Sequence, residues 1–156
     1  GCIQSPQNAF LLNLGLESLH VRMPQHVKNG QAMAEFLHDH PKVRFVKYPG
    51  LPDDPWHELA QKYLPNGCCG VVSFGFTGGR AAAEQFMKSL HVAQIATHVA
   101  DARTCVLHPA NATHRQMTDG ELAAAGIAPD MVRLSCGIED TDDLIADVAQ
   151  ALDALQ

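Results

Sequence analysis

Histidine and cysteine side chains gather in one polar stretch of the chain, residues 98–116, which holds three of its nine histidines. Imidazoles and thiolates are the ligands that Zn²⁺ prefers, so a metal site is one hypothesis. Its candidate ligands are His98, His108, His114, Cys105 and Cys136. Their spacings match no zinc pattern, and scattered matches arise easily by chance. We therefore favour histidines that form hydrogen bonds in loops, and we predict no metal site.

A cysteine nucleophile beside one of these histidines is a second hypothesis. Cys105 lies in the middle of a short apolar run and Cys136 directly follows another, which favours packed, unreactive thiols. The five cysteines are odd in number and have no C-x-x-C spacing. This usage is typical of reduced thiols in a cytoplasmic protein rather than of a disulfide framework.

Arg133 is the most unusual cation of the chain, because it interrupts the apolar segment 131–135. A guanidinium in such a strand is costly unless it is paired, and its fork matches a carboxylate in two parallel hydrogen bonds. One interpretation is a site for an anionic ligand. The other is an internal salt bridge, to Glu139 or Asp140. Composition and spacing favour these two interpretations equally.

The elements that must position these residues follow from apolar periodicity and from turn residues. Helical spacing predicts helices near residues 5–19, 20–39, 56–63, 80–90, 118–126 and 140–155. Alternating or continuous apolar runs predict strands near residues 43–48, 70–76, 92–95, 104–107 and 131–135. Helices and strands are mixed with no internal repeat and no long linker. This pattern predicts one α+β unit, an α/β sandwich in which helices cover a small sheet.

The first predicted helix is apolar nearly all round, with Phe10, Leu11 and Leu14 on one side and further leucines beside them. Such a helix is typically buried, so an isolated unit would leave part of it exposed. The chain also begins at Gly1 without an initiator Met. We therefore expect that it is a piece of a longer protein and that this helix packs against a missing partner.

Charge and length exclude several classes of protein. The 156 residues carry 11 Lys plus Arg against 17 Asp plus Glu, a formal net charge of −6. The cations are scattered singly, which argues against a nucleic-acid partner or an anionic membrane surface. No stretch reaches the roughly 20 apolar residues that span a bilayer, and no basic region followed by an apolar run opens the chain. We expect a cytoplasmic protein.

Several motifs together resemble one family of enzymes. They are residues 5–12 (SPQNAFLL), 15–19 (GLESL), 22–23 (RM), 48–52 (YPGLP), 108–110 (HPA), 113–114 (TH), 132–135 (VRLS) and 137–140 (GIED). In this order they resemble the C-terminal part of the pyridoxal-phosphate-dependent enzymes of cysteine and methionine metabolism, over essentially the whole chain. Residues 101–104 (DART) and 108–116 (HPANATHRQ) are most similar to the O-acetylhomoserine sulfhydrylases within that family.

The resemblance implies a fold and a reaction. The fold is the small C-terminal domain of a type I, aminotransferase-like enzyme, in which helices flank a mostly antiparallel sheet and a long N-terminal helix links back to a cofactor domain. Residues 1–40 would be the linking helices and residues 41–156 the sheet-and-helix domain. The reaction is a γ-replacement, in which acetate leaves O-acetyl-L-homoserine and sulfide adds to give L-homocysteine.

The resemblance also assigns two residues to the substrate. Arg133 falls on the arginine that holds the substrate α-carboxylate, which favours the ligand interpretation of this residue. His98 falls where many relatives have Ser or Asn, in the loop on the carboxylate side, and is a second candidate for substrate binding. Ala100 replaces a commonly seen Gly.

The cofactor residues of the family have no counterpart here. The Schiff-base lysine of the family follows a Ser-x-Thr sequence, whereas the five lysines of this chain follow Val, Pro, Val, Gln and Met. Pyridoxal phosphate would be bound by an absent N-terminal cofactor domain, which is the partner that the resemblance implies, in a homo-oligomer such as a homotetramer. We expect this chain alone to hold no catalytic residue and to be inactive.

Related reactions remain alternatives. Cystathionine γ-synthase, the β- and γ-lyases and the O-succinylhomoserine sulfhydrylases share the role implied for Arg133. They differ in acyl and nucleophile pockets built largely outside this region. An alternative of another class is a non-catalytic assembly module that uses the apolar first helix as its interface.

Overall fold

The computed structural model describes residues 1–155. The helices are α1 (Pro6–Glu17), α2 (Leu19–His38), α3 (His57–Tyr63), α4 (Gly79–Ser89), α5 (Asp119–Ala124), α6 (Thr141–Asp153) and the short 3₁₀ helix η1 (Pro109–Asn111). The strands are β1 (Val43–Lys47), β2 (Val71–Phe76), β3 (Gln94–Ile95), β4 (Cys105–Leu107) and β5 (Val132–Ser135). Each predicted helix and strand is present, with ends that differ by a residue or two. None of the described helices is both long enough and apolar enough to cross a membrane.

Helix starts lie where local capping signals predict them. The hydroxyl of Ser5 accepts a hydrogen bond from the N–H of Asn8, with Pro6 in the first turn of α1. Thr118 and Glu121 form a reciprocal capping box at α5. Asp140 accepts from the N–H of Asp142 at the start of α6. These bonds join residues two or three apart, which is why the sequence alone predicts them.

The five strands form one sheet in the order β1-β2-β5-β4-β3. The β1/β2, β2/β5 and β5/β4 pairs are antiparallel, and only β3 and β4 run parallel. The mostly antiparallel sheet flanked by helices is therefore confirmed. β5 lies at the centre, so Arg133 is carried by the most constrained strand of the sheet.

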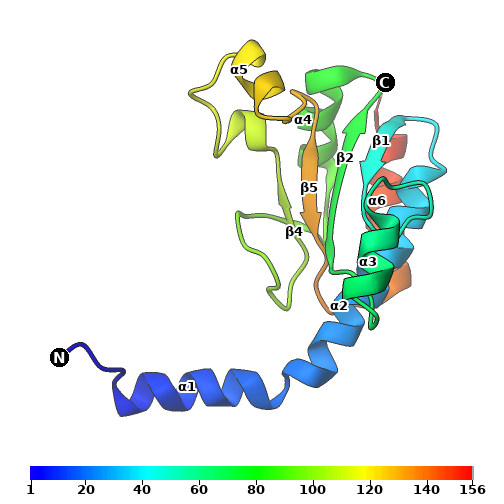
Figure 1. Ribbon diagram of the computed structural model, residues 1–156. Helices are drawn as coiled ribbons and strands as arrows, with labels where there is room; N and C mark the ends of the chain where they lie inside the picture. The colour runs from blue at the N-terminus through cyan, green and yellow to red at the C-terminus, as the bar shows by residue number, and fades with distance from the viewer. Residues whose placement is uncertain (156) are drawn as a thin grey trace.

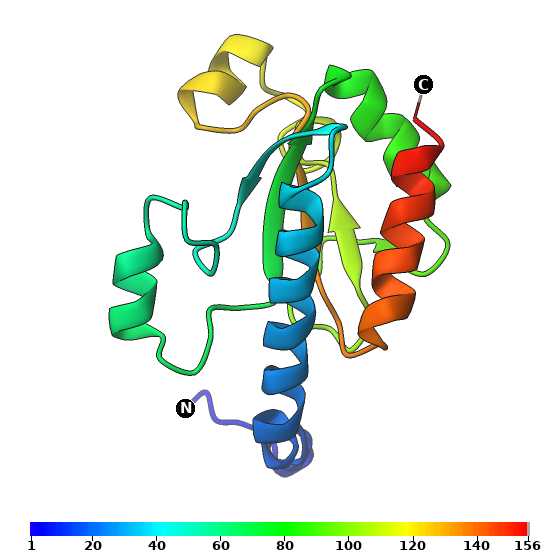
Figure 2. The same ribbon diagram turned by 90° about the vertical axis from the view of Figure 1, so that its right-hand side faces the viewer.

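One face of this sheet packs against α2, α4 and α6, which lie side by side over it (Figure 2). Because side chains alternate along a strand, Val72, Phe74, Val132 and Leu134 all point to this covered face. Phe74 meets Phe86 of α4 edge to face, with ring centroids 5.6 Å apart. The hydrophobic core of the chain lies between this face and the three helices.

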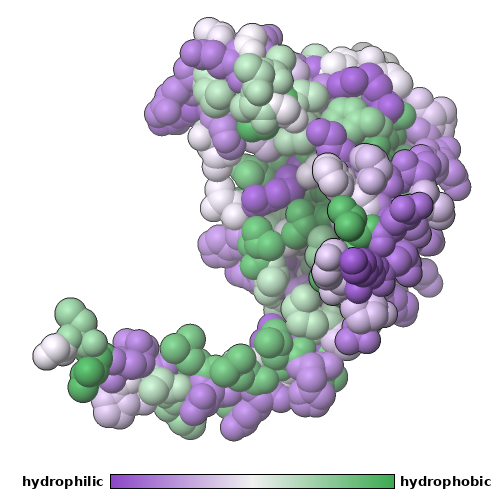
Figure 3. Space-filling model, in the orientation of Figure 1, coloured by the Kyte–Doolittle hydropathy of each residue, from purple (hydrophilic) through white to green (hydrophobic). Residues whose placement is uncertain are grey.

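α1 differs from the other long helices because it projects away from the sheet (Figure 1). It has no buried residue, and Phe10, Leu12 and Leu16 are each more than 60% exposed. Figure 3 shows hydrophobic side chains along this arm and in the hollow of the sheet beside it. The predicted exposure of the first helix is confirmed. α2, in contrast, buries Met33, Ala34 and Leu37 in the core.

Candidate functional site

The face of the sheet opposite the three helices is the candidate site, and we refer to it as the open face. One row of paired residues across it consists of Lys47, Ser73, Arg133 and Leu107. The next row consists of Val71, Ser135 and Cys105. Figure 1 shows this face turned toward the side from which α1 projects. The strands β2 and β5 thus carry polar and charged side chains on the open face and core side chains on the covered face.

Arg133 is held by one hydrogen bond, from Nη2 to the carbonyl oxygen of Thr97 at 3.0 Å. Its Nε is buried and has no partner among residues 1–155. A buried donor without a partner costs about 1–3 kcal/mol, so the guanidinium has unused capacity for an acceptor. No ion pair to Arg133 forms within the described part of the chain.

The internal salt bridge that the sequence left open for Arg133 is absent, for a structural reason. The carboxylate of Glu139 accepts from the N–H of Thr104 at 2.6 Å and from its hydroxyl at 2.8 Å. Asp140 is engaged as the cap of α6. Both carboxylates bind other groups, so neither pairs with Arg133. This favours the interpretation that Arg133 binds an anionic ligand.

The loop that carries Thr97 is under backbone strain. Ala100 is the one non-glycine residue with positive φ, at 57°, in the described chain. This left-handed conformation costs a side chain with a Cβ about 1–2 kcal/mol. The N–H of Ala100 donates to Oγ of Ser135 at 3.2 Å, which ties the loop to β5. The strained loop is therefore fixed against the strand that carries Arg133.

His98 lies in the same loop, with its side chain largely exposed. Its Nδ1 is 3.3 Å from Oδ2 of Asp101. Hydrogen bonds from the backbone and then the guanidinium of Arg103, with a further one from His98, hold the pKa of Asp101 well below its usual range. The carboxylate is therefore ionised at neutral pH and holds the imidazole at the edge of the site. Among the described residues His98 forms no hydrogen bond with Arg133, but Thr97, the residue before it, accepts one from the guanidinium.

The other histidines and thiols of the polar stretch do not come together. Nε2 of His108 is 2.8 Å from the carbonyl of Pro129, and Nδ1 of His114 is 2.9 Å from the hydroxyl of Thr113. Burial raises the pKa of Cys136 to about 12 and also raises the pKa of Cys105. Both thiols are therefore protonated and buried, as the sequence predicts for packed cysteines. Among residues 1–155 no group of three His, Cys, Asp or Glu side chains could hold a metal ion.

The lysines do not fit a covalent cofactor site. Lys42 donates to the carbonyls of Leu152 and Leu155 at the end of α6. Lys47 lies on the open face, but its ammonium is over the ring of Phe45, 5.6 Å from the centroid. Lys62 lies over Tyr63, and the remaining two lysines are on α2 and α4. None donates a hydrogen bond to Thr97 or Ser135. The open face of this chain fits the carboxylate of a ligand rather than a lysine-bound cofactor.

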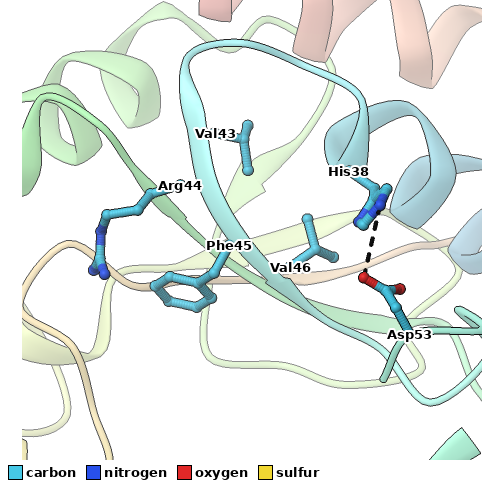
Figure 4. A pocket seen from close by; sticks show the side chains of 6 residues that line it. All are labelled: His38, Val43, Arg44, Phe45, Val46 and Asp53. Carbon is cyan, nitrogen blue, oxygen red and sulfur yellow. Dashed lines mark ion pairs between the residues drawn. The ribbon is translucent and has the colours of Figure 1, made fainter. Parts of the chain in front are cut away.

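A separate hollow beside β1 offers no comparable cation (Figure 4). His38 and Asp53 point toward each other at one side of it, with Nε2 and Oδ2 3.7 Å apart. Arg44, which also lines it, is paired with the buried carboxylate of Asp130 at 2.6 Å. A paired guanidinium has little left to offer a ligand, so Arg133 is the stronger candidate.

Two residues that bind at or near β5, Thr97 and His26, were not identified from the sequence. Thr97 acts through its backbone carbonyl, which every residue type possesses. His26, in α2, brings Nδ1 to 2.7 Å from the carbonyl of Cys136, directly after β5. For His26, the only signal in the sequence was its position on the buried side of the predicted helix.

Comparisons with known proteins identify the family to which this chain belongs. The model of the Cys/Met metabolism PLP-dependent enzyme family matches residues 1–153. This chain belongs to that family, whose members depend on pyridoxal phosphate.

Individual relatives cover nearly all of the chain. Homocysteine synthase of Schizosaccharomyces pombe is 47% identical over 149 residues, which are 96% of this chain and 35% of that protein. An L-methionine gamma-lyase of Porphyromonas gingivalis is 41% identical over 157 residues, which are 99% of this chain and 39% of that protein. The chain thus spans little more than a third of the length of these relatives.

A solved structure shares the fold. A Campylobacter jejuni protein described as an O-acetylhomoserine (thiol)-lyase superposes with a TM-score of 0.90 at 38% identity, covering 98% of this chain and 36% of its own. That crystal structure contains a pyridoxyl-lysine monophosphate. The resemblance of the motifs to this family is confirmed.

Proposed function

We propose that this chain is the substrate-carboxylate-binding region of a pyridoxal-phosphate-dependent γ-replacement enzyme. The reaction is O-acetyl-L-homoserine plus sulfide to L-homocysteine plus acetate, a step in methionine and cysteine biosynthesis. One observation carries the proposal: Arg133 presents a guanidinium without an acidic partner on the open face, with Nε buried and unpaired. Relatives named as homocysteine synthase and as O-acetyl-L-homoserine sulfhydrylases support the choice of reaction.

Arg133 would act by positioning the substrate. A carboxylate offers two oxygens to two parallel N–H groups, and the central strand β5 keeps the guanidinium rigid. A substrate held in this way presents its Cα–H in one orientation, which converts binding energy into rate. His98, at the rim of the same loop, is the second proposed substrate contact. The bound cofactor would supply the electron sink, and this chain would supply orientation and charge.

The missing parts would come from elsewhere in the enzyme. We expect a cofactor domain to precede residues 1–40, which would link it to the sheet domain of residues 41–156, in a homo-oligomer. The coding sequence upstream of Gly1 tests this: a Ser-x-Thr-Lys sequence within it is the expected result, and an unrelated reading frame would contradict it. The purified chain mixed with pyridoxal phosphate should show no new visible absorbance.

The reaction itself is tested with the complete enzyme and four substrate combinations, the acetyl and succinyl esters of homoserine with either sulfide or cysteine. We expect the acetyl ester with sulfide to be fastest. Preferred use of cysteine would indicate a cystathionine γ-synthase. Product formation without any added nucleophile would indicate a lyase.

A non-catalytic assembly module is the second candidate, and the exposed apolar side chains of α1 favour it. Size-exclusion chromatography of the chain with and without residues 1–17 tests the role of this helix. Self-association that depends on α1, in a protein that shows no turnover with any ester, would favour the assembly module over the enzyme.

A further inference from the structure

The loop of residues 97–101, between β3 and β4, is held against β5 by few contacts. Residues 97–100 are all exposed, so apolar packing does little to fix their conformation. Two hydrogen bonds join the loop to β5, one from Arg133 to the carbonyl of Thr97 and one from the N–H of Ala100 to Ser135. The other hydrogen bonds of the loop in the described chain stay within residues 97–103. The conformation of this loop therefore depends on β5.

Both of these bonds reach β5 on the open face. Arg133 and Ser135 are two residues apart on this strand, so their side chains point to the same side of the sheet. Ser135 is buried, and it is paired with Val71 on one neighbouring strand and with Cys105 on the other. Its backbone is thus fixed from both sides, which makes its hydroxyl a rigid anchor for the loop.

The hydroxyl of Ser135 supports a backbone conformation that alanine does not favour. Ala100 has a φ of 57°, in the left-handed region, where its Cβ crowds the following carbonyl oxygen. The N–H of Ala100 donates to Oγ of Ser135 at 3.2 Å in this conformation. The net gain from one such hydrogen bond is similar in size to the cost of the left-handed conformation. Without the hydroxyl, Ala100 should return to negative φ, and the residues beside it should move.

A movement of this loop would change the orientation of Arg133. Thr97 lies three residues before Ala100, and its carbonyl is the one hydrogen-bond partner of the Arg133 side chain in the described chain. A bidentate contact requires the plane of the guanidinium to match the plane of the carboxylate. Because β5 fixes only the backbone of Arg133, the carbonyl of Thr97 is what sets this plane at the end of a long side chain.

We propose that Ser135 is a positioning residue for the carboxylate site. Its hydroxyl holds Ala100 in the left-handed conformation, which places the carbonyl of Thr97 on Nη2 of Arg133 and so orients the guanidinium. Ser135 acts through the loop and through Arg133, without a contact of its own to the substrate. This inference rests on the proposed function, because the orientation of Arg133 matters only if Arg133 binds the substrate carboxylate.

Binding of an unreactive amino acid to the complete enzyme tests this role. L-Norleucine has the α-carboxylate but no γ leaving group, and L-norleucinamide lacks the carboxylate. Ser135→Ala should raise the Kd for norleucine about threefold to tenfold, as expected for one lost hydrogen bond, and change the Kd for the amide less than about twofold. Ser89→Ala is the matched control, because the Ser89 hydroxyl donates to the carbonyl of Gln85 within α4, and it should change neither Kd. Calorimetry measures both.

Second substitutions distinguish positioning from a general structural role. Glycine adopts positive φ without a steric cost, so Ala100→Gly added to Ser135→Ala should recover most of the lost affinity for norleucine. Ala102→Gly, added in the same way at a residue without positive φ, should recover none. In an Arg133→Met background, Ser135→Ala should have almost no further effect, because the group that it positions is gone.

The outcomes separate this inference from the proposed function. If Arg133→Met weakens norleucine binding but Ser135→Ala does not, Ser135 has no positioning role and the proposed function stands. Equal weakening of norleucine and its amide by Ser135→Ala, or recovery by Ala102→Gly as well as by Ala100→Gly, would also overturn the inference. If Arg133→Met leaves norleucine binding unchanged, the proposed function is contradicted and the role of Ser135 with it.

Discussion

The two faces of the sheet differ in what their residues contribute, although the same strands supply both. On the covered face, Phe74 and its neighbours are fully buried and pack against three helices. On the open face, Ser73 and Arg133 lie in the next positions along the same strands, with few partners. Arg133, one of the two described side chains that have a buried polar atom without a partner, lies on the open face. Stability is concentrated on one face and unused binding capacity on the other.

This difference shows how a small domain can combine a rigid site with a stable core. The period of two along β2 and β5 lets each residue serve one face without disturbing the other. Arg133 is held in place because Val132 and Leu134, on either side of it, are both buried in the core. The open face is thus positioned by the packing of the covered face.

The largest expected effect is on the covered face. Phe74→Ala removes a ring that contacts both Phe76 and Phe86, and should lower the free energy of unfolding by about 3–5 kcal/mol. Ser73→Ala, one residue away on the open face, should change it by less than about 0.5 kcal/mol. Urea unfolding of the two variants checks the pair. Equal losses in both would contradict the division of the faces.

On the open face, Arg133→Met should reduce kcat/KM of the complete enzyme by about 30-fold to 1,000-fold, the cost of leaving a buried carboxylate unpaired. The free energy of unfolding of this variant should change little, because the Arg133 side chain makes only one hydrogen bond, to Thr97. Arg133→Lys should recover only part of the activity, because an ammonium lacks the planar fork.

Arg44→Met is the matched control for this cation. Arg44 pairs with the buried carboxylate of Asp130, so its loss should lower the urea midpoint and leave kcat/KM intact. Loss of activity in Arg44→Met with full activity in Arg133→Met would reverse the assignment.

A smaller effect is expected at Asp147 of α6, on the covered side. Burial alone would raise the pKa of Asp147, but hydrogen bonds from the N–H groups of Ala93, His91 and Val92 outweigh burial and lower it. Asp147→Asn should cost about 1–3 kcal/mol at neutral pH.

The pH dependence of this loss has a definite sign. A carboxyl whose pKa is lower in the folded protein contributes its full stabilisation above the unfolded pKa of about 3.9 and loses it as the pH falls through the folded value. The difference between wild type and Asp147→Asn should therefore shrink below about pH 4. Thermal unfolding between pH 7 and pH 3 measures it, and a constant difference would contradict the prediction.

The smallest effect concerns the strained loop of the open face. Ala100→Gly relieves a positive φ of 57° and should raise the free energy of unfolding by about 0.5–1 kcal/mol. Ala102→Gly, nearby in the same loop at ordinary φ, should be neutral or destabilising. If both variants were stabilised, or neither, strain at Ala100 would not be the cause of any change in stability.

Much of the fold was predictable because its signals are local. Ser5 with Pro6, Thr118 with Glu121, and Asp140 each fix a helix start through bonds within three residues. The apolar run of residues 131–135 predicted a strand that Arg133 interrupts. The candidate site was predictable only in part: Arg133 stood out by its residue type, whereas Thr97 contributes a carbonyl that no side chain reveals.

The sequence by itself determined the elements, the family and the odd cation of β5, since each depends on residue types at short spacing. The tertiary structure decided which partners the acidic side chains have. Glu139 turns to Thr104, 35 residues away, rather than to Arg133, and Thr97 reaches Arg133 from 36 residues away. It also brought His26 to the end of β5, 110 residues along the chain. Such pairings depend on strand register and helix packing, which local propensity does not specify.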